Sequence, residues 1–229
     1  PVQVWGPAGE TEDLGTKAYT HHIEAAHAWD MATMKGHPGE SGARTVTTEV
    51  PNDKPALVYD RNGVKISSFP VDHAIKGAVG YRIDYNGLAV VFSGDTRPTE
   101  SIREACKGGV DVLIHETFPS AEIFARKAGL TEVDARKVID KIHTSPTAVG
   151  QIFQRAGARM SVVWHFSVDH ETVGPAYQQV RAEYDGPFTI AQDLTVCDIT
   201  KNAVAGRQAI IDPVAWPVTD GPGHTPRDY

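Results

Sequence analysis

The sequence lacks features that would place it in several common classes of protein. It contains no run of 18 or more apolar residues, so no typical membrane-spanning helix is expected. Its two cysteines, Cys106 and Cys197, are too few for a disulfide scaffold and are not spaced as a zinc-binding pair. Lysine and arginine (22) are outnumbered by aspartate and glutamate (29), giving a net charge of −7. This balance argues against nucleic-acid binding through a broad basic surface but leaves a local basic groove open.

The order of the expected elements indicates an α/β domain. Asn62-Gly63 and Asn86-Gly87 each lie between alternating apolar residues, which predicts two β-hairpins. We expect helices near 16–35, 98–107, 119–128, 131–141, 146–157 and 171–184, and strands near 2–5, 110–115, 160–165 and 187–199. The sequence therefore predicts one layered domain over residues 1–229, with an irregular, Pro/Gly-rich tail from 200 to 229.

Three residues of the metal-ligand type follow predicted strands. His73 comes after "ISSFPVD", Asp95 after "AVVFSG" and His165 after "MSVVW". Functional sites of layered α/β folds collect at such strand ends, and two imidazoles with a carboxylate suit Zn²⁺, with Mn²⁺ or Fe as alternatives. Taken singly, each residue has a structural explanation, because a strand-end histidine can be a hydrogen-bonded packing residue and Asp95 can cap a turn.

A second pair of residues could transfer protons. Glu116 ends the predicted strand in "DVLIHETF", and His143 stands just before the helix in "KIHTSPTAVGQI". A histidine oriented by a carboxylate is a common proton donor or acceptor near neutral pH. The spacing leaves two plainer alternatives open, in which His143 packs at the helix start and Glu116 lies on the surface.

Four motifs in this order resemble the metallo-β-lactamase superfamily, and within it the ribonuclease Z and arylsulfatase-like branch. They are "FSGDT", "DVLIHETF", "HTSPTAVGQIFQRAG" and "VVWHFS", and the resemblance covers most of residues 1–199. It implies a four-layer αβ/βα sandwich with two metal ions, typically zinc, in a cleft at the sheet edge. It implies hydrolysis by a metal-bound hydroxide.

The same resemblance implies roles for the candidate residues. His73 matches a ligand of the first metal, His165 matches a ligand of the second, and Asp95 matches the carboxylate that bridges the two. His143, oriented by Glu116, matches the group that gives a proton to the leaving group. A carboxylate between two metals keeps them about 3.5–4 Å apart.

The sequence departs from the family pattern at its beginning. The family's HxHxDH motif, which supplies four ligands, should precede the opening "VQVWGPAG", and no HxH occurs in the 229 residues. We therefore expect the chain to represent the C-terminal two thirds of the sandwich, with full activity requiring an N-terminal fragment of the same protein.

The substrate expected from the sequence is a small-molecule ester. Members that process transfer RNA carry a long arm between the positions of His73 and Asp95, whereas only 21 residues separate them here and read as a hairpin. We expect a sulfate ester, phosphodiester, lactone or β-lactam as substrate. A ribonuclease Z-like nuclease is the alternative, and a metal-free binding or structural protein is a second one. The resemblance allows a homodimer and leaves the cytoplasm and export both open.

Overall fold

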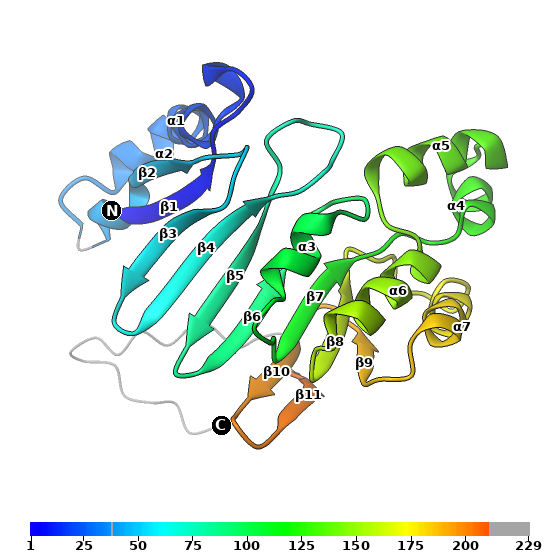
Figure 1. Cartoon of the computed structure of the whole chain (residues 1–229). Helices are drawn as coiled ribbons and strands as arrows, with labels where there is room; N and C mark the ends of the chain where they lie inside the picture. Colours follow the sequence, from blue (N-terminus) through cyan, green and yellow to red (C-terminus); the bar gives the residue numbers. More distant parts are fainter. Residues whose placement is uncertain (38, 211–229) are drawn as a thin grey trace.

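A mixed seven-stranded sheet is the centre of the fold (Figure 1). The computed structural model describes residues 1–37 and 39–210. In spatial order the strands are β3 (Ala56–Arg61), β4 (Val64–Pro70), β5 (Val79–Tyr85), β6 (Leu88–Phe92), β7 (Val112–Glu116), β8 (Met160–Trp164) and β9 (Phe188–Ile190). Neighbours from β3 to β6 are antiparallel, and neighbours from β6 to β9 are parallel.

Both predicted hairpins are present. The β3–β4 turn contains Asn62 and Gly63 at φ 56° and 77°, and the β5–β6 turn contains Asn86 and Gly87 at φ 51° and 76°. Type I′ turns require positive φ at both central residues, and Asn-Gly adopts this conformation at little cost. These turns bring four antiparallel strands up to the parallel half of the sheet.

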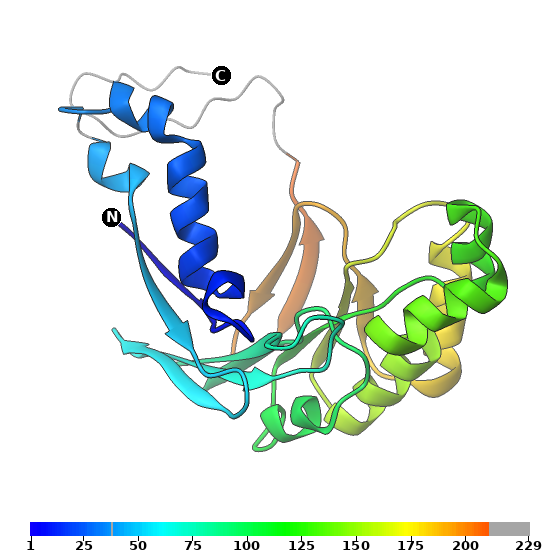
Figure 2. The same cartoon turned by 90° about the horizontal axis from the view of Figure 1, so that it is seen from above.

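Helices cover one face of the sheet (Figure 2). They are α3 (Glu100–Ala105), α6 (Pro146–Ala156) and α7 (Val173–Glu183), while α4 (Ala121–Ala128) and α5 (Glu132–Ile142) lie beside them. The hydrophobic core lies between these helices and the strands, where Phe153 of α6 packs with Val91, Leu113 and Val163, all four fully buried. Ser145 caps α6 by accepting a hydrogen bond from the Ala148 N–H.

Two smaller sheets rise from the opposite side of the main sheet (Figure 2). One pairs β1 (Val2–Pro7) in parallel with β2 (Thr45–Val50), and α1 packs on both strands. The other is the antiparallel hairpin of β10 (Thr195–Ile199) and β11 (Val204–Gln208). The remaining elements of this side are α1 (Thr16–Ala26), α2 (Ala28–Thr33) and two short 3₁₀ helices, Glu12–Leu14 and Glu40–Ala43.

The structure differs from the predicted elements in three places. Residues 16–35 form two helices, because the chain leaves helical geometry at His27. β11 occupies part of the segment expected to be irregular, so the prediction for 200–229 is wrong over 204–208. Strand β2 consists mainly of threonine and valine, which favour β-structure, in a region read mainly as loop. Residues 211–229 of the predicted tail lie outside the described residues. Within the described part, no helix is long and apolar enough to cross a membrane.

Candidate active site

The candidate residues converge because three parallel strands end at the same edge of the sheet. The register pairs Phe92 of β6 with Ile114 of β7, and Ile114 with Val162 of β8. Asp95 follows β6, Glu116 ends β7 and His165 follows β8. Carboxyl ends of neighbouring parallel strands form a cleft at which ligands bind in α/β folds. The strand order therefore brings together residues that are far apart in the sequence.

Glu116 and His143 form a buried pair. The Nδ1 atom of His143 lies 3.0 Å from Oε1 of Glu116, and the two residues are 9% and 0% exposed. The same Oε1 accepts the backbone N–H of Thr96 at 3.0 Å. When Nδ1 carries the proton shared with Glu116, Nε2 is left free to exchange a proton in the cleft. The pair has the arrangement expected of a general acid and the carboxylate that orients it.

His165 and Asp95 form the more open side of the site. The Nδ1 atom of His165 lies 3.6 Å from Oδ1 of Asp95, and each side chain is about one third exposed. His165 has a φ of 55°, in the left-handed region that few non-glycine residues adopt. Such a backbone persists only where the surroundings fix it, and it is frequent at functional sites.

His73 reaches the same site from β4. Its Nδ1 atom lies 3.0 Å from the carbonyl oxygen of Ile142, and its ring centroid is 5.4 Å from that of His143. A carbonyl at this position fixes the proton on Nδ1 and leaves Nε2 as an acceptor. Metal-binding histidines are commonly oriented in this way.

The residues present fit a divalent metal ion such as zinc. Ligand atoms of Glu116, His143 and His165 all lie within 4.8 Å of one another. Oε2 of Glu116 is buried and has no hydrogen-bond partner among the described residues. Imidazole and carboxylate donors suit zinc, and a buried acceptor without a partner requires a physical explanation such as a bound cation.

The compact cluster is not the ligand set that the sequence predicts. The predicted ligands are His73, Asp95 and His165, and the cluster shares only His165 with them. Glu116 and His143 enter the cluster because they lie in the same cleft as the predicted ligands. All five candidate residues therefore lie in one group of neighbouring side chains, and their separate roles stay predictions.

Two residues of the site carry no assigned role in the sequence. Phe118 lies flat on His143, with ring centroids 4.2 Å apart and an interplanar angle of 4°, and its ring is 5.7 Å from that of His165. Thr96 is fully buried and its N–H holds Glu116. Phe118 belongs to the motif "HETF" and Thr96 to the motif "SGDT". The motifs therefore contain both residues, but neither residue type by itself indicates metal binding or proton transfer.

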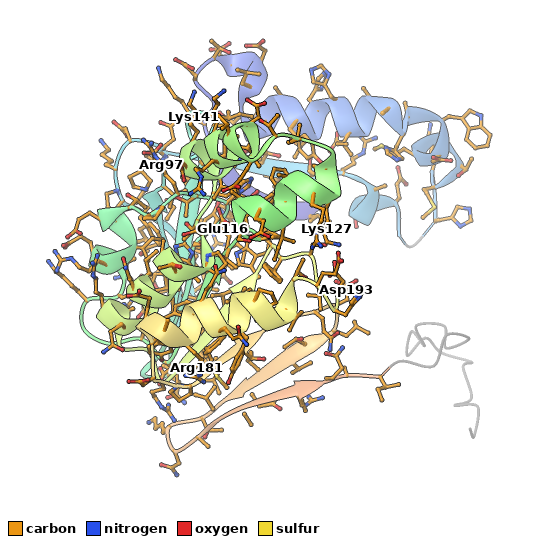
Figure 3. The ribbon with its side chains drawn as sticks, turned by 90° about the vertical axis from the view of Figure 1, so that its right-hand side faces the viewer. Arg97, Glu116, Lys127, Lys141, Arg181 and Asp193 are labelled. Atoms are coloured by element: carbon orange, nitrogen blue, oxygen red, sulfur yellow. The ribbon has the colours of Figure 1, made fainter. Side chains whose placement is uncertain are left out.

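A polar pocket opens beside His165. It has a volume of about 650 Å³ and is lined by Trp164, His165, Phe166, Val168, Ala191, Gln192 and Asp193. Figure 3 shows Asp193 near this edge of the molecule, with Glu116 deeper in the fold. A substrate that reaches the histidines would have room for a neighbouring group here.

His115 points into the fold next to the site. It is fully buried, its Nδ1 atom lies 2.8 Å from the Glu116 carbonyl oxygen, and Nε2 has no partner in the described chain. Burial lowers the pKa of His115 to about 4, against a smaller opposing effect of the hydrogen bond to Glu116. His115 is therefore neutral at physiological pH.

Comparison with known proteins identifies the family. The family model described as "Beta-lactamase superfamily domain" matches residues 14–166. The chain therefore belongs to the β-lactamase superfamily, and the predicted membership and α/β fold class are confirmed. A metallo-β-lactamase fold protein from Bacillus subtilis has a TM-score of 0.51 and 14% identity, over 83% of this chain and 62% of that one.

The curated relatives are named ribonuclease Z. A putative ribonuclease Z of Mycobacterium tuberculosis (strain CDC 1551 / Oshkosh) is 27% identical over 85% of this chain and 82% of its own length. The ribonuclease Z of strain H37Rv is also 27% identical, over 85% of this chain and 67% of its own length. The ribonuclease Z of Mycobacterium marinum is 30% identical over 72% of this chain and 55% of its own length. These relatives favour the nuclease alternative over the small-molecule ester expected from the sequence.

Proposed function

We propose that this chain belongs to a metal-dependent hydrolase of phosphodiester bonds. The observation that carries the proposal is the buried Glu116–His143 pair, which lies in one group of side chains with His73, Asp95 and His165. The ribonuclease Z relatives supply the bond type. Of the small-molecule esters expected from the sequence, the phosphodiester shares this bond type, whereas the sulfate ester, the lactone and the β-lactam have no support of this kind.

The five side chains divide into two roles in this proposal. His73, Asp95 and His165 would hold the metal, and Asp95 follows β6, which lies between β4 and β8 in the sheet. Zinc bound there would lower the pKa of water and withdraw negative charge from the phosphoryl oxygens. His143 would give a proton from Nε2 to the leaving oxygen when its ring carries protons on both nitrogens, and Glu116 orients the ring by accepting the hydrogen bond from Nδ1–H.

The walls of the cleft support this division. Phe118 covers one face of the His143 ring and excludes water from it. Thr96 fixes Glu116 through its N–H and bonds to the Arg97 carbonyl through its hydroxyl, at 2.7 Å. A rigid, partly dry general acid needs little reorganisation during the reaction.

Cationic side chains at the rim suit an anionic substrate. Arg97 is about half exposed and pairs with Asp72, next to His73. Lys141 precedes Ile142, whose carbonyl contacts His73, and it has no ion-pair partner among residues 1–37 and 39–210. Figure 3 shows both cations at the same upper edge, above Glu116. Among the described residues, Lys141 therefore offers an unpaired cation beside the candidate site, whereas the charge of Arg97 is balanced by Asp72.

Substrate competition tests the proposal. The purified native protein is loaded with zinc. It is then assayed with bis(p-nitrophenyl) phosphate, p-nitrophenyl sulfate and a chromogenic β-lactam under the same conditions. We expect metal-dependent release of nitrophenol from the phosphodiester at a higher kcat/KM than from the other two. Preferential cleavage of the sulfate or the β-lactam would overturn the phosphodiesterase assignment.

A further inference from the structure

Helices α4 and α5 form a hairpin inserted between two candidate active-site residues. The chain leaves the cleft at Glu116, runs through both helices and returns to the cleft at His143. The two helices pack against each other, and Gly129 turns the chain between them at φ 67°. Figure 1 shows the hairpin at the upper right of the fold, above α6 and α7. A shift of this hairpin would therefore move the chain next to both Glu116 and His143.

An aromatic contact connects the hairpin to the histidines. The Phe124 ring of α4 meets Phe118 edge-on, with centroids 5.0 Å apart. Phe118 in turn stacks on His143 and contacts His165. Because aromatic rings are rigid, the place of α4 fixes that of Phe118 and restricts both imidazoles.

Ion pairs connect the other side of α4 to the segment that follows His165. Nζ of Lys127 lies 2.8 Å from Oδ2 of Asp169 and 3.5 Å from Oε2 of Glu171, and Arg126 lies 3.5 Å from Glu171. Figure 3 shows Lys127 extending from α4 toward this segment, which leads into α7. The side chains of Lys127, Asp169 and Glu171 are each about one third exposed.

Asp169 is itself held in place by its own backbone. Its Oδ1 accepts the N–H groups of Glu171 at 2.9 Å and Thr172 at 3.1 Å. The hydrogen bond that Lys127 donates to Asp169 lowers the pKa of Asp169 to about 2 and raises the pKa of Lys127. Lys127 therefore binds a preformed turn with both groups charged over the physiological range.

The other ion pairs of the hairpin remain inside it. Lys137 pairs with Asp134 at 2.8 Å, and Arg136 pairs with Glu132 at 2.6 Å, all within α5. Among the described residues, only Lys127 and Arg126 join the hairpin to another part of the molecule by ion pairs. Lys137 is thus a matched control, with the same chemistry and no such connection.

We propose that Lys127 is a positioning residue whose ion pairs with Asp169 and Glu171 hold the α4–α5 hairpin against the His165 segment. Through Phe124 and Phe118 these pairs set the relative placement of His143 and His165. The expected effect of Lys127 on turnover rests on the proposed function. The effect of its ion pairs on the placement of the hairpin and the histidines does not.

Hydrogen exchange and NMR test the connection without any substrate. Lys127→Met removes the charge and keeps the apolar stem, and Lys137→Met is the control. In the metal-loaded protein we expect Lys127→Met to accelerate amide exchange in 121–142 and 167–172 together by about three- to fivefold. The carbon-bound protons of His143 should move downfield as Phe118 stacks less closely. Lys127→Arg should restore both properties, because arginine can pair with the same carboxylates.

Two results would overturn the proposal. One is unchanged exchange and unchanged His143 resonances in Lys127→Met. The other is an equal effect of Lys137→Met. Turnover measurements distinguish failure of the Lys127 proposal from failure of the proposed function. If Lys127→Met accelerates exchange in both segments while the wild-type protein cleaves no phosphodiester, the Lys127 proposal is supported and the phosphodiesterase function is rejected. In an active enzyme, kcat should fall at unchanged metal content, and high salt should reproduce the loss in the wild-type protein.

Discussion

His143 and Glu116 lie 3.0 Å apart, although 26 residues separate them in the sequence, and the pair is almost completely removed from water. The α4–α5 hairpin spans the intervening chain and returns His143 to the end of β7. A buried carboxylate needs a partner, and the imidazole together with the Thr96 N–H supplies one for Oε1. This pair is the basis of the first prediction.

Replacing His143 should separate chemistry from metal binding. We expect His143→Ala to keep its metal content and to lose turnover by about 10²–10⁴-fold, because the general acid is removed. Glu116→Gln should retain the hydrogen bond to His143 and lose less turnover than His143→Ala. Elemental analysis and steady-state kinetics on one preparation give both quantities. Loss of metal together with activity would move His143 to the ligand set of the compact cluster.

Asp95→Ala should release the metal, because a carboxylate between two cations is a ligand of both. We expect elemental analysis after gel filtration to find less than one ion per chain, with the fold retained by circular dichroism. Asp193→Ala, which alters the neighbouring pocket and not the cluster, is the control. Full metal content in Asp95→Ala would exclude the bridging role.

Lys141→Ala should act on long anionic substrates. We expect a higher KM for an oligoribonucleotide, an unchanged KM for bis(p-nitrophenyl) phosphate, and a salt dependence of binding reduced by about one in slope. Lys201, an exposed lysine beyond β10, provides the control substitution. Equal effects on both substrates would mean that Lys141 does not contact the nucleic-acid backbone.

Acid should destabilise the metal-depleted protein through His115. Its pKa in the folded protein is about 4, below the ordinary histidine value of 6.5, because burial disfavours the charged form. Between pH 4 and 6.5 the unfolded chain binds more protons at His115 than the folded protein does. The free energy of unfolding is therefore highest above about pH 6.5 and decreases as the pH drops toward 4. The difference corresponds to about 3 kcal/mol. Urea unfolding of His115→Asn should lack this slope. Equal slopes in the variant and the wild-type protein would contradict the assignment.

The sequence predicts those elements whose signals are local. Asn-Gly turns and the apolar runs of β6, β7 and β8 are determined by residues close to one another, and the structure confirms them. Residues 16–35 read as one helix because the break at His27 has no glycine or proline to mark it. β11 was missed because its alternation is weak and its pairing with β10 is its main support.

The candidate site was predictable in its members and not in its contacts. Strand-end position singled out His73, Asp95 and His165, and the motifs singled out Glu116 and His143. The contact of His73 with the Ile142 carbonyl, the flat Phe118 stack and the Lys127–Asp169 pair join segments 20 or more residues apart. No local pattern encodes such contacts, because they depend on how the hairpin and the strands pack.

Zinc titration of the chelated native product is the measurement that tests the central claim most directly. Bound zinc and hydrolysis of bis(p-nitrophenyl) phosphate are measured in the same samples, beside the His143→Ala variant. The account predicts that hydrolysis rises with bound zinc in the wild-type protein, and that the variant binds the same zinc with turnover lower by at least about 100-fold. Zinc binding without hydrolysis in the wild-type protein, or no zinc binding at all, would contradict it.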